Sequence, residues 1–89
     1  MIAPLQLRAS QGPKPGEVRL GWKRVKTARS YVVQRSQDPA QGFTQVSVLT
    51  TRSVLLEAQP SATPLWYRLA AIGSSGQGPW CAPVPIIAP

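Results

Sequence analysis

The most informative feature of this 89-residue sequence is what it lacks: it has no histidine, one cysteine and three carboxylates, Glu17, Asp38 and Glu57. Nucleophilic triads need a base such as histidine, and zinc sites need several Cys or His ligands. A glycosidase-type pair needs two carboxyl groups about 5–9.5 Å apart in a cleft. We expect Glu17 to precede a strand, Asp38 to form a turn and Glu57 to face outward from a strand. The sequence therefore predicts no enzyme, no metal site and no cofactor.

A single cysteine, Cys81, excludes an intrachain disulfide and leaves the redox compartment open. We expect it to be a small buried hydrophobe, because free cysteines are more often packed than reactive. The first residues lack the basic start and apolar run of a signal peptide. No stretch approaches the roughly 18 apolar residues of a membrane-spanning helix, so we expect no membrane span.

What the sequence does have is alternation of apolar and polar residues, the period of half-buried strands. Turn-forming clusters at 12–16, 38–42, 59–61 and 73–79 recur at intervals typical of an all-β sandwich, and ten prolines exclude long helices. Pro83 and Pro85 indicate that the last strand lies at an edge or is broken. We expect about seven antiparallel strands in a single domain, residues 1–89: 4–8, 17–23, 30–35, 43–49, 53–58, 65–72 and 80–87.

Five landmarks follow one another in the order of a known family. They are Val18-x-Leu20-x-Trp22, Ser30-Tyr31-x-Val33, Gly42-Phe43, Tyr67-Arg68-Leu69 and the glycine-rich stretch before Pro79. Over about residues 3–87 the chain resembles a fibronectin type III domain. The resemblance implies an immunoglobulin-like β-sandwich with a core that contains Trp22, Tyr31, Val33, Tyr67 and Leu69.

One corner departs from that family pattern. Ala58-x-Pro60 stands in place of Leu-x-Pro, and Leu65 stands where the corner tyrosine would be. The hydroxyl of that tyrosine normally bonds to the nearby backbone. The corner therefore needs another fastening, or Tyr67 serves in a shifted register.

Positive charge is the main functional lead, since ten Lys and Arg give a net charge of +7. Four of the cations fall within the seven positions 23–29, mostly in the expected loop between the second and third strands: Lys23, Arg24, Lys26 and Arg29. Such clusters attract nucleic acid, acidic polysaccharide, anionic lipid or acidic protein. No aromatic residue interleaves with them, as base stacking would require. A solvated loop is the favoured interpretation, and a polyanion site is the alternative.

Trp66 and Arg68 are expected on the outward side of one strand, if Tyr67 and Leu69 point inward. They would form a cation–π pair or part of a partner-binding patch. Trp80 could fold over this face, and we favour the covered pair.

The resemblance implies a non-catalytic spacer or an interaction module for a protein or a glycan. Its parent would be a larger extracellular, cell-surface or phage virion protein, and the style of the sequence is bacterial or phage-like. The alternative is a polyanion-binding module that uses the basic loop, with nucleic acid the more weakly supported ligand.

Overall fold

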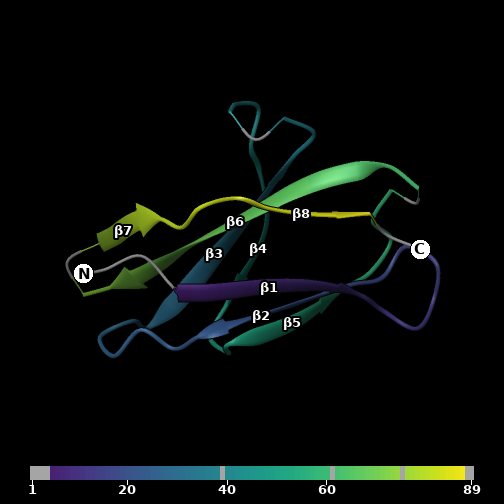
Figure 1. The fold of residues 1–89 in the computed structure, drawn as a ribbon. Coiled ribbons are helices and arrows are strands. Elements are labelled where there is room, and N and C mark those ends of the chain that lie inside the picture. The colour runs from purple at the N-terminus through teal and green to yellow at the C-terminus, as the bar shows by residue number, and fades with distance from the viewer. Residues whose placement is uncertain (1–4, 39, 61, 75, 88–89) are drawn as a thin grey trace.

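The computed structural model describes residues 5–38, 40–60, 62–74 and 76–87, which form eight strands in two antiparallel sheets (Figure 1). The smaller sheet has the order β1-β2-β5. Its strands are β1 (Leu5–Gln11), β2 (Val18–Lys23) and β5 (Ser53–Leu56). The two sheets pack face to face, so the expected β-sandwich is confirmed.

The larger sheet has β6 (Pro64–Gly73) as its long spine. On one side of β6 lie β3 (Ser30–Ser36) and then β4 (Thr44–Leu49). On the other side, β7 (Gly76–Trp80) pairs with the second half of β6, and β8 (Val84–Ile87) pairs with the first half.

The structure has eight strands where about seven were expected, because the closing segment forms two strands. Pro83 lies in the gap between β7 and β8, and Pro85 lies in β8 at the edge of the sheet. A proline has no N–H for the ladder, so the chain breaks pairing here and resumes it further along β6. The glycine-rich stretch is also shorter as a turn than expected, since Gly76 already begins β7.

The core follows the alternation of the strands. In β2, Val18, Leu20 and Trp22 are buried between the sheets, whereas Arg19 and Lys23 are exposed. Trp22 meets the ring of Tyr31 edge-on, with ring centroids 5.4 Å apart. The residues expected in the core all lie in it: Trp22, Tyr31, Val33, Tyr67 and Leu69.

The strand ends differ from the expected ranges in two places. The first strand continues to Gln11 rather than ending at Arg8, and its expected start at Pro4 lies outside the described residues. The fifth strand ends at Leu56, where we expected Ala58. Ala58 has a φ of 57°, which is incompatible with extended pairing, so the exposed Glu57 is not part of the strand. No helix in the described ranges is long and apolar enough to cross a membrane.

Candidate functional site: the basic end of the sandwich

The loop between β2 and β3 is anchored from within by Val25, which is only 5% exposed. The backbone N–H of Val25 donates a 2.8 Å hydrogen bond to the buried Tyr31 hydroxyl. Its carbonyl accepts the N–H of Ala28 at 3.0 Å, and the N–H of Arg29 donates to the Ile72 carbonyl at 2.7 Å. These contacts fix the path of the loop at the lower left of Figure 1.

All four cations expected in this region are exposed: Lys23, Arg24, Lys26 and Arg29. Lys23 is the last residue of β2, and the other three lie in the anchored loop. Their side chains form no hydrogen bond or ion pair with another described residue. The four charges are therefore held on a fixed backbone and remain open to a ligand.

The fold brings two further arginines to this end, which the sequence did not indicate. In the register of the smaller sheet, Arg8 of β1 faces Gly21 of β2, and Gly21 faces Ser53 of β5. Arg52 precedes β5, and its carbonyl accepts the N–H of Trp22 at 3.0 Å. We name the resulting set the basic end: Arg8, Lys23, Arg24, Lys26, Arg29 and Arg52.

Two hollows lie at the basic end, and residues at the turn between β4 and β5 line both of them. The Gly21 groove, of about 490 Å³, is lined by Arg8, Gly21, Trp22, Lys23, Arg52 and Ser53. The Thr50 hollow, of about 500 Å³, is lined by Arg24, Tyr31, Thr50, Thr51, Arg52 and Ser53. Arg52 and Ser53 belong to both.

The three carboxylates lie elsewhere in the structure. Glu17 is buried at the opposite end of β2, where its Oε1 accepts the N–H of Lys14 at 3.1 Å. Glu57 follows Leu56, which pairs with Val18 at that same opposite end. Asp38 lies in the connection between β3 and β4, where its Oδ1 accepts the N–H of Ala40 at 2.9 Å. Uncompensated positive charge at one end makes that end attractive to anions.

Arg68 lies on the outward face of the larger sheet, but its aromatic partners are Phe43 and Trp80 rather than the expected Trp66. The Arg68 Cζ lies 4.1 Å from the ring centroid of Phe43 and 4.3 Å from that of Trp80. Its Nε and Nη2 both donate to Gln34 Oε1, at 2.9 and 2.7 Å. Within the described residues Trp66 forms no cation–π contact with Arg68, because cross-strand neighbours lie closer than a residue two positions along one strand. Trp80 does cover this face, and a covered face is a weak candidate for partner binding.

Comparison with solved structures gives matches over almost the whole chain. An Fn3-like protein from Clostridium thermocellum superposes with a TM-score of 0.88 at 21% identity, covering 97% of this chain and 91% of that one. The chain has the fibronectin type III fold. The FN5 domain of Drosophila Lar matches at 0.76 and 17% identity, over 98% and 95% of the two chains.

Part of a much longer chain also matches. The structure of titin kinase and its flanking domains aligns with a TM-score of 0.83 and 17% identity, over 97% of this chain and 17% of that one. No protein-family model matches the sequence, and no curated protein matches it. The likeness therefore establishes the fold and leaves the function to the residues of this chain.

The corner that departs from the fibronectin type III pattern is fastened by Tyr67 and Gln59. The Tyr67 hydroxyl donates a 2.7 Å hydrogen bond to Gln59 Oε1, and Gln59 Nε2 donates to the Glu57 carbonyl at 3.0 Å. The backbone N–H of Gln59 donates to the Gly16 carbonyl at 2.8 Å. Tyr67 thus reaches the corner backbone through a glutamine side chain, while Leu65 is buried in the core.

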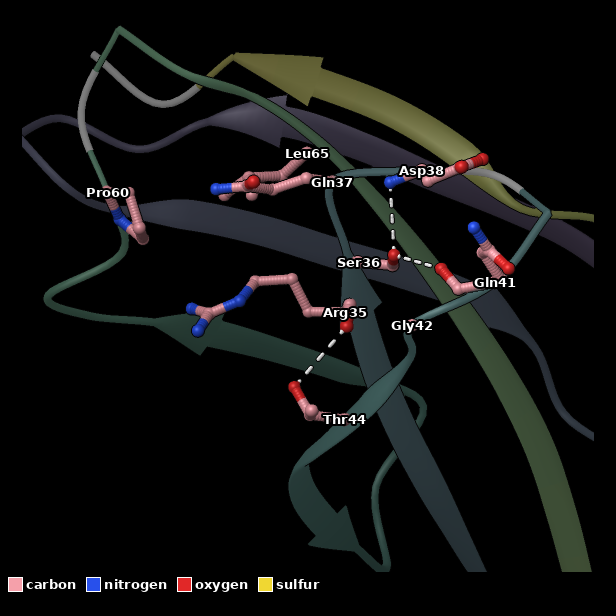
Figure 2. Close-up of a pocket in the computed structure, with 9 residues that line it drawn as sticks. All are labelled: Arg35, Ser36, Gln37, Asp38, Gln41, Gly42, Thr44, Pro60 and Leu65. Carbon is pink, nitrogen blue, oxygen red and sulfur yellow. Dashed lines mark hydrogen bonds between the residues drawn. The ribbon is translucent and has the colours of Figure 1, made fainter.

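Figure 2 shows a third hollow, of about 520 Å³, into which the side chain of Arg35 extends near Pro60. Arg35 Nη1 donates to Gln59 Oε1 at 2.6 Å, so this arginine belongs to the corner network. The Ser36 hydroxyl accepts the N–H of Asp38 at 3.0 Å and donates to the Gln41 carbonyl, which closes the hairpin beside the hollow. This hollow is lined by Arg35, whose guanidinium is already bonded to Gln59, and by the carboxylate of Asp38. It therefore does not attract anions as the basic end does.

Cys81 is half-buried and packs against the core, and its N–H donates to the Leu69 carbonyl at 2.9 Å. Burial raises the pKa of its thiol, an effect only partly offset by backbone hydrogen bonds and Arg68. A thiol with a raised pKa is a poor nucleophile at neutral pH. The described residues contain no group of three His, Cys, Asp or Glu side chains that could hold a metal ion.

Proposed function

We propose that this chain is a non-catalytic interaction module of a larger protein and that its contact surface is the basic end. Domains of this fold generally serve as interaction or spacer modules within multidomain proteins. The observation that carries the proposal is the anchored loop between β2 and β3. Buried Val25 holds the loop in place, so that its cations are presented to a partner without the cost of ordering a mobile segment.

The partner that fits this surface is an acidic protein or an acidic glycan. Six cations with no described counter-charge favour a ligand that brings negative charge. As part of the same proposal, the parent protein is extracellular, on a cell surface or in a virion, as the resemblance to fibronectin type III domains implies.

Binding to an array of acidic and neutral glycans and acidic peptides tests this function. We expect the protein to bind acidic members only. The variant with Lys23, Arg24, Lys26 and Arg29 all replaced by Ser should lose that binding while keeping its circular dichroism spectrum. Equal binding by the variant and the parent chain, or binding to neutral members alone, would show that the basic end is not the contact surface.

A second candidate is general polyanion binding, favoured by the concentration of charge at one end rather than over the whole surface. Retention on heparin and DNA resins distinguishes it from bland charge, since screening removes weak surface attraction at roughly 0.2 M salt. Elution well above that salt concentration, lost in the fourfold Ser variant, would support a polyanion site. Elution of both proteins below it would leave only non-specific charge.

A further inference from the structure

β4 is the outermost strand of the larger sheet, on the side of β3 away from β6 (Figure 1). It pairs with β3 alone, so alternate backbone N–H and C=O groups of residues 44–49 point away from the sheet, with no described strand beside them. An extended segment of another chain can complete these hydrogen bonds by adding a further strand to the sheet.

The other edges of the two sheets carry features that discourage such pairing. β7 contains Pro79 and β8 contains Pro85, and a proline has no N–H for a ladder. β1 contains Arg8 and lies beside β8, where Gln11 Nε2 donates to the Ile87 carbonyl at 2.8 Å. β5 is only four residues long. Among the described strands, β4 is therefore the edge best suited to strand addition.

The sequence of β4 leaves its edge open. Its six residues include no proline, no glycine and no charged side chain. Its one protective device is a bulge at Val46, where the pairing with β3 skips a residue. Residues 47–49 keep regular pairing with β3, so the half of the edge that leads into Thr50 is the half that can receive a partner.

Val48 makes this half of the edge apolar as well as open. It is 51% exposed and pairs with Val32 of β3, which alternates with the inward Tyr31 and Val33 and so faces the outer surface of the larger sheet. A strand added beside β4 would place one of its side chains next to Val48. Covering this apolar side chain would stabilise the complex.

The charge at the two ends of β4 selects the kind of segment. Leu49, the last residue of β4, leads into the Thr50 hollow, which is lined by Arg24 and Arg52. At the other end of β4, the hairpin from β3 carries the carboxylate of Asp38. A segment antiparallel to β4 begins at the arginine end, so acidic residues at its start would lie beside the two arginines.

A second copy of this chain is a poorer occupant of the edge. Each copy has a net charge of +7, and repulsion between such charges opposes self-association. A segment of opposite charge is attracted instead, which favours a different, acidic partner.

We propose that β4 receives an extended segment of a partner protein as an antiparallel strand, with acidic residues at the start of that segment beside Arg24 and Arg52. For the acidic character of the partner, this inference rests on the proposed function. It adds that the partner is a protein, that it binds in the β conformation, and that the backbone of residues 47–49 holds it.

A synthetic peptide of sequence Glu-Glu-Thr-Val-Thr-Val-Thr-Ser is the probe, because backbone pairing tolerates many side-chain sequences. We expect it to bind in calorimetry and to change the amide chemical shifts of β4 more than those of β1 or β5. Absence of binding by this peptide would overturn the inference.

Methylation of the peptide backbone distinguishes strand addition from attraction by charge. A docked strand pairs with β4 along one of its own edges, which presents the N–H groups of alternate residues only. N-methylation of one alternate set should therefore abolish binding, whereas N-methylation of the other set should preserve it. Equal binding by the two methylated peptides, which have the same charge, would overturn the inference.

Val48→Lys places a charge on the edge, a device by which natural edge strands avoid pairing. The position is half exposed, so the thermal midpoint should stay near that of the parent chain. We expect the peptide affinity to fall about tenfold or more, although an added cation would by itself attract the glutamates. The charge-matched control is Leu55→Lys, at a 39% exposed position of β5, which should not weaken binding. Equal affinities of the two variants would overturn the inference.

The direction and the kind of occupant are tested separately. A peptide of reversed sequence, with its glutamates last, should bind more weakly, and equal or tighter binding would overturn the antiparallel arrangement. Sedimentation of the chain alone should show a monomer. A dimer that dissociates on Val48→Lys would assign the edge to a second copy and overturn the acidic partner.

The fourfold Ser variant separates this inference from the proposed function. If that variant lost peptide binding while Val48→Lys and both methylated peptides had no effect, the inference would fall and the proposed function would stand. If Val48→Lys lost binding while the fourfold Ser variant bound fully, the basic end would not be the contact surface, and strand addition to β4 would stand without it.

Discussion

At the scale of single residues, the corner network shows how one glutamine replaces a missing tyrosine contact. Gln59 is 9% exposed, and its Oε1 accepts hydrogen bonds from both the Tyr67 hydroxyl and Arg35 Nη1. Its Nε2 donates to the Glu57 carbonyl. A buried amide is stabilising only when its polar atoms are paired, and here both ends are.

Tyr67→Phe should lower the free energy of unfolding by about 1–2 kcal/mol, because it removes a buried hydrogen bond and leaves the ring in place. The measurement is urea unfolding of the single variant and of the same change in a Gln59→Ala background. If the hydroxyl acts through Gln59, the loss should be clearly smaller in that background. Equal losses in the two backgrounds would contradict the network.

The same hydroxyl gives a pH prediction. Burial raises the pKa of Tyr67 above its ordinary value of 10.0, and the nearby Arg35 offsets this only in part. As the pH rises past 10, the unfolded chain loses this proton before the folded chain does. The free energy of unfolding therefore falls with rising pH.

The stability advantage of the parent chain over Tyr67→Phe should accordingly be present at pH 9 and shrink by pH 11. Every other ionisable group is common to the two proteins, so the difference between them isolates Tyr67. An advantage that stayed constant or grew between these pH values would contradict the burial of a protonated phenol.

Trp22 is the largest side chain between the two sheets, and it contacts the Tyr31 ring edge-on. Trp22→Ala should cost about 3–5 kcal/mol, because it leaves a cavity in a close-packed core. A domain of this size has a free energy of unfolding of about 5–9 kcal/mol, so the variant should be close to unfolded. Thermal denaturation checks this, and a midpoint within a few degrees of the parent chain would contradict the packing.

At the scale of elements, Arg68 ties four segments of the larger sheet on its outer face. Its guanidinium lies between Phe43, which precedes β4, and Trp80 of β7, and it bonds to Gln34 of β3. Trp80 also pairs with Ala70 and covers it, which is why Ala70 is fully buried on an outward position. The stack closes one face of the sheet.

Arg68→Ala should lower the free energy of unfolding by about 1–2 kcal/mol, from two half-exposed cation–π contacts and a charged hydrogen bond. Arg68→Lys should recover only part of this, because lysine lacks the planar group that stacks on both rings. The control is Arg19→Ala, an exposed position of β2, which should change stability by no more than about 0.5 kcal/mol. Equal effects in urea unfolding at Arg68 and Arg19 would contradict the stack.

The sequence predicted the strands whose inward residues alternate, and it failed where pairing partners decide the structure. The expected range 30–35 became Ser30–Ser36, and 65–72 became Pro64–Gly73. The start of β7 at Gly76 was missed because glycine favours turns locally, and only pairing with β6 makes this segment a strand. The predicted aromatic partner of Arg68 was wrong for the same reason, because its neighbours across the sheet, Phe43 and Trp80, are distant in sequence.

At the scale of the whole molecule, the fold gathers six cations at one end and places the three carboxylates elsewhere. A run of cations in the sequence marked one loop, but the basic end also contains Arg8 and Arg52, which lie 15 or more residues from that run. Their arrival depends on the register of β1 against β2 and on the turn before β5. The loop could be predicted from the sequence, whereas the two hollows that it borders could not.

The most direct test of the account is the salt dependence of binding to a heparin oligosaccharide. Each cation that neutralises an anionic group releases about one counterion, so the slope of log K against log salt counts the contacts. We predict a slope of about −4 or steeper for the parent chain. The slope should become shallower by about one in Arg52→Ser and stay unchanged in Lys14→Ser, at the opposite end of the smaller sheet. A slope near −1 for the parent chain, or an equal change in both variants, would contradict a binding surface at the basic end.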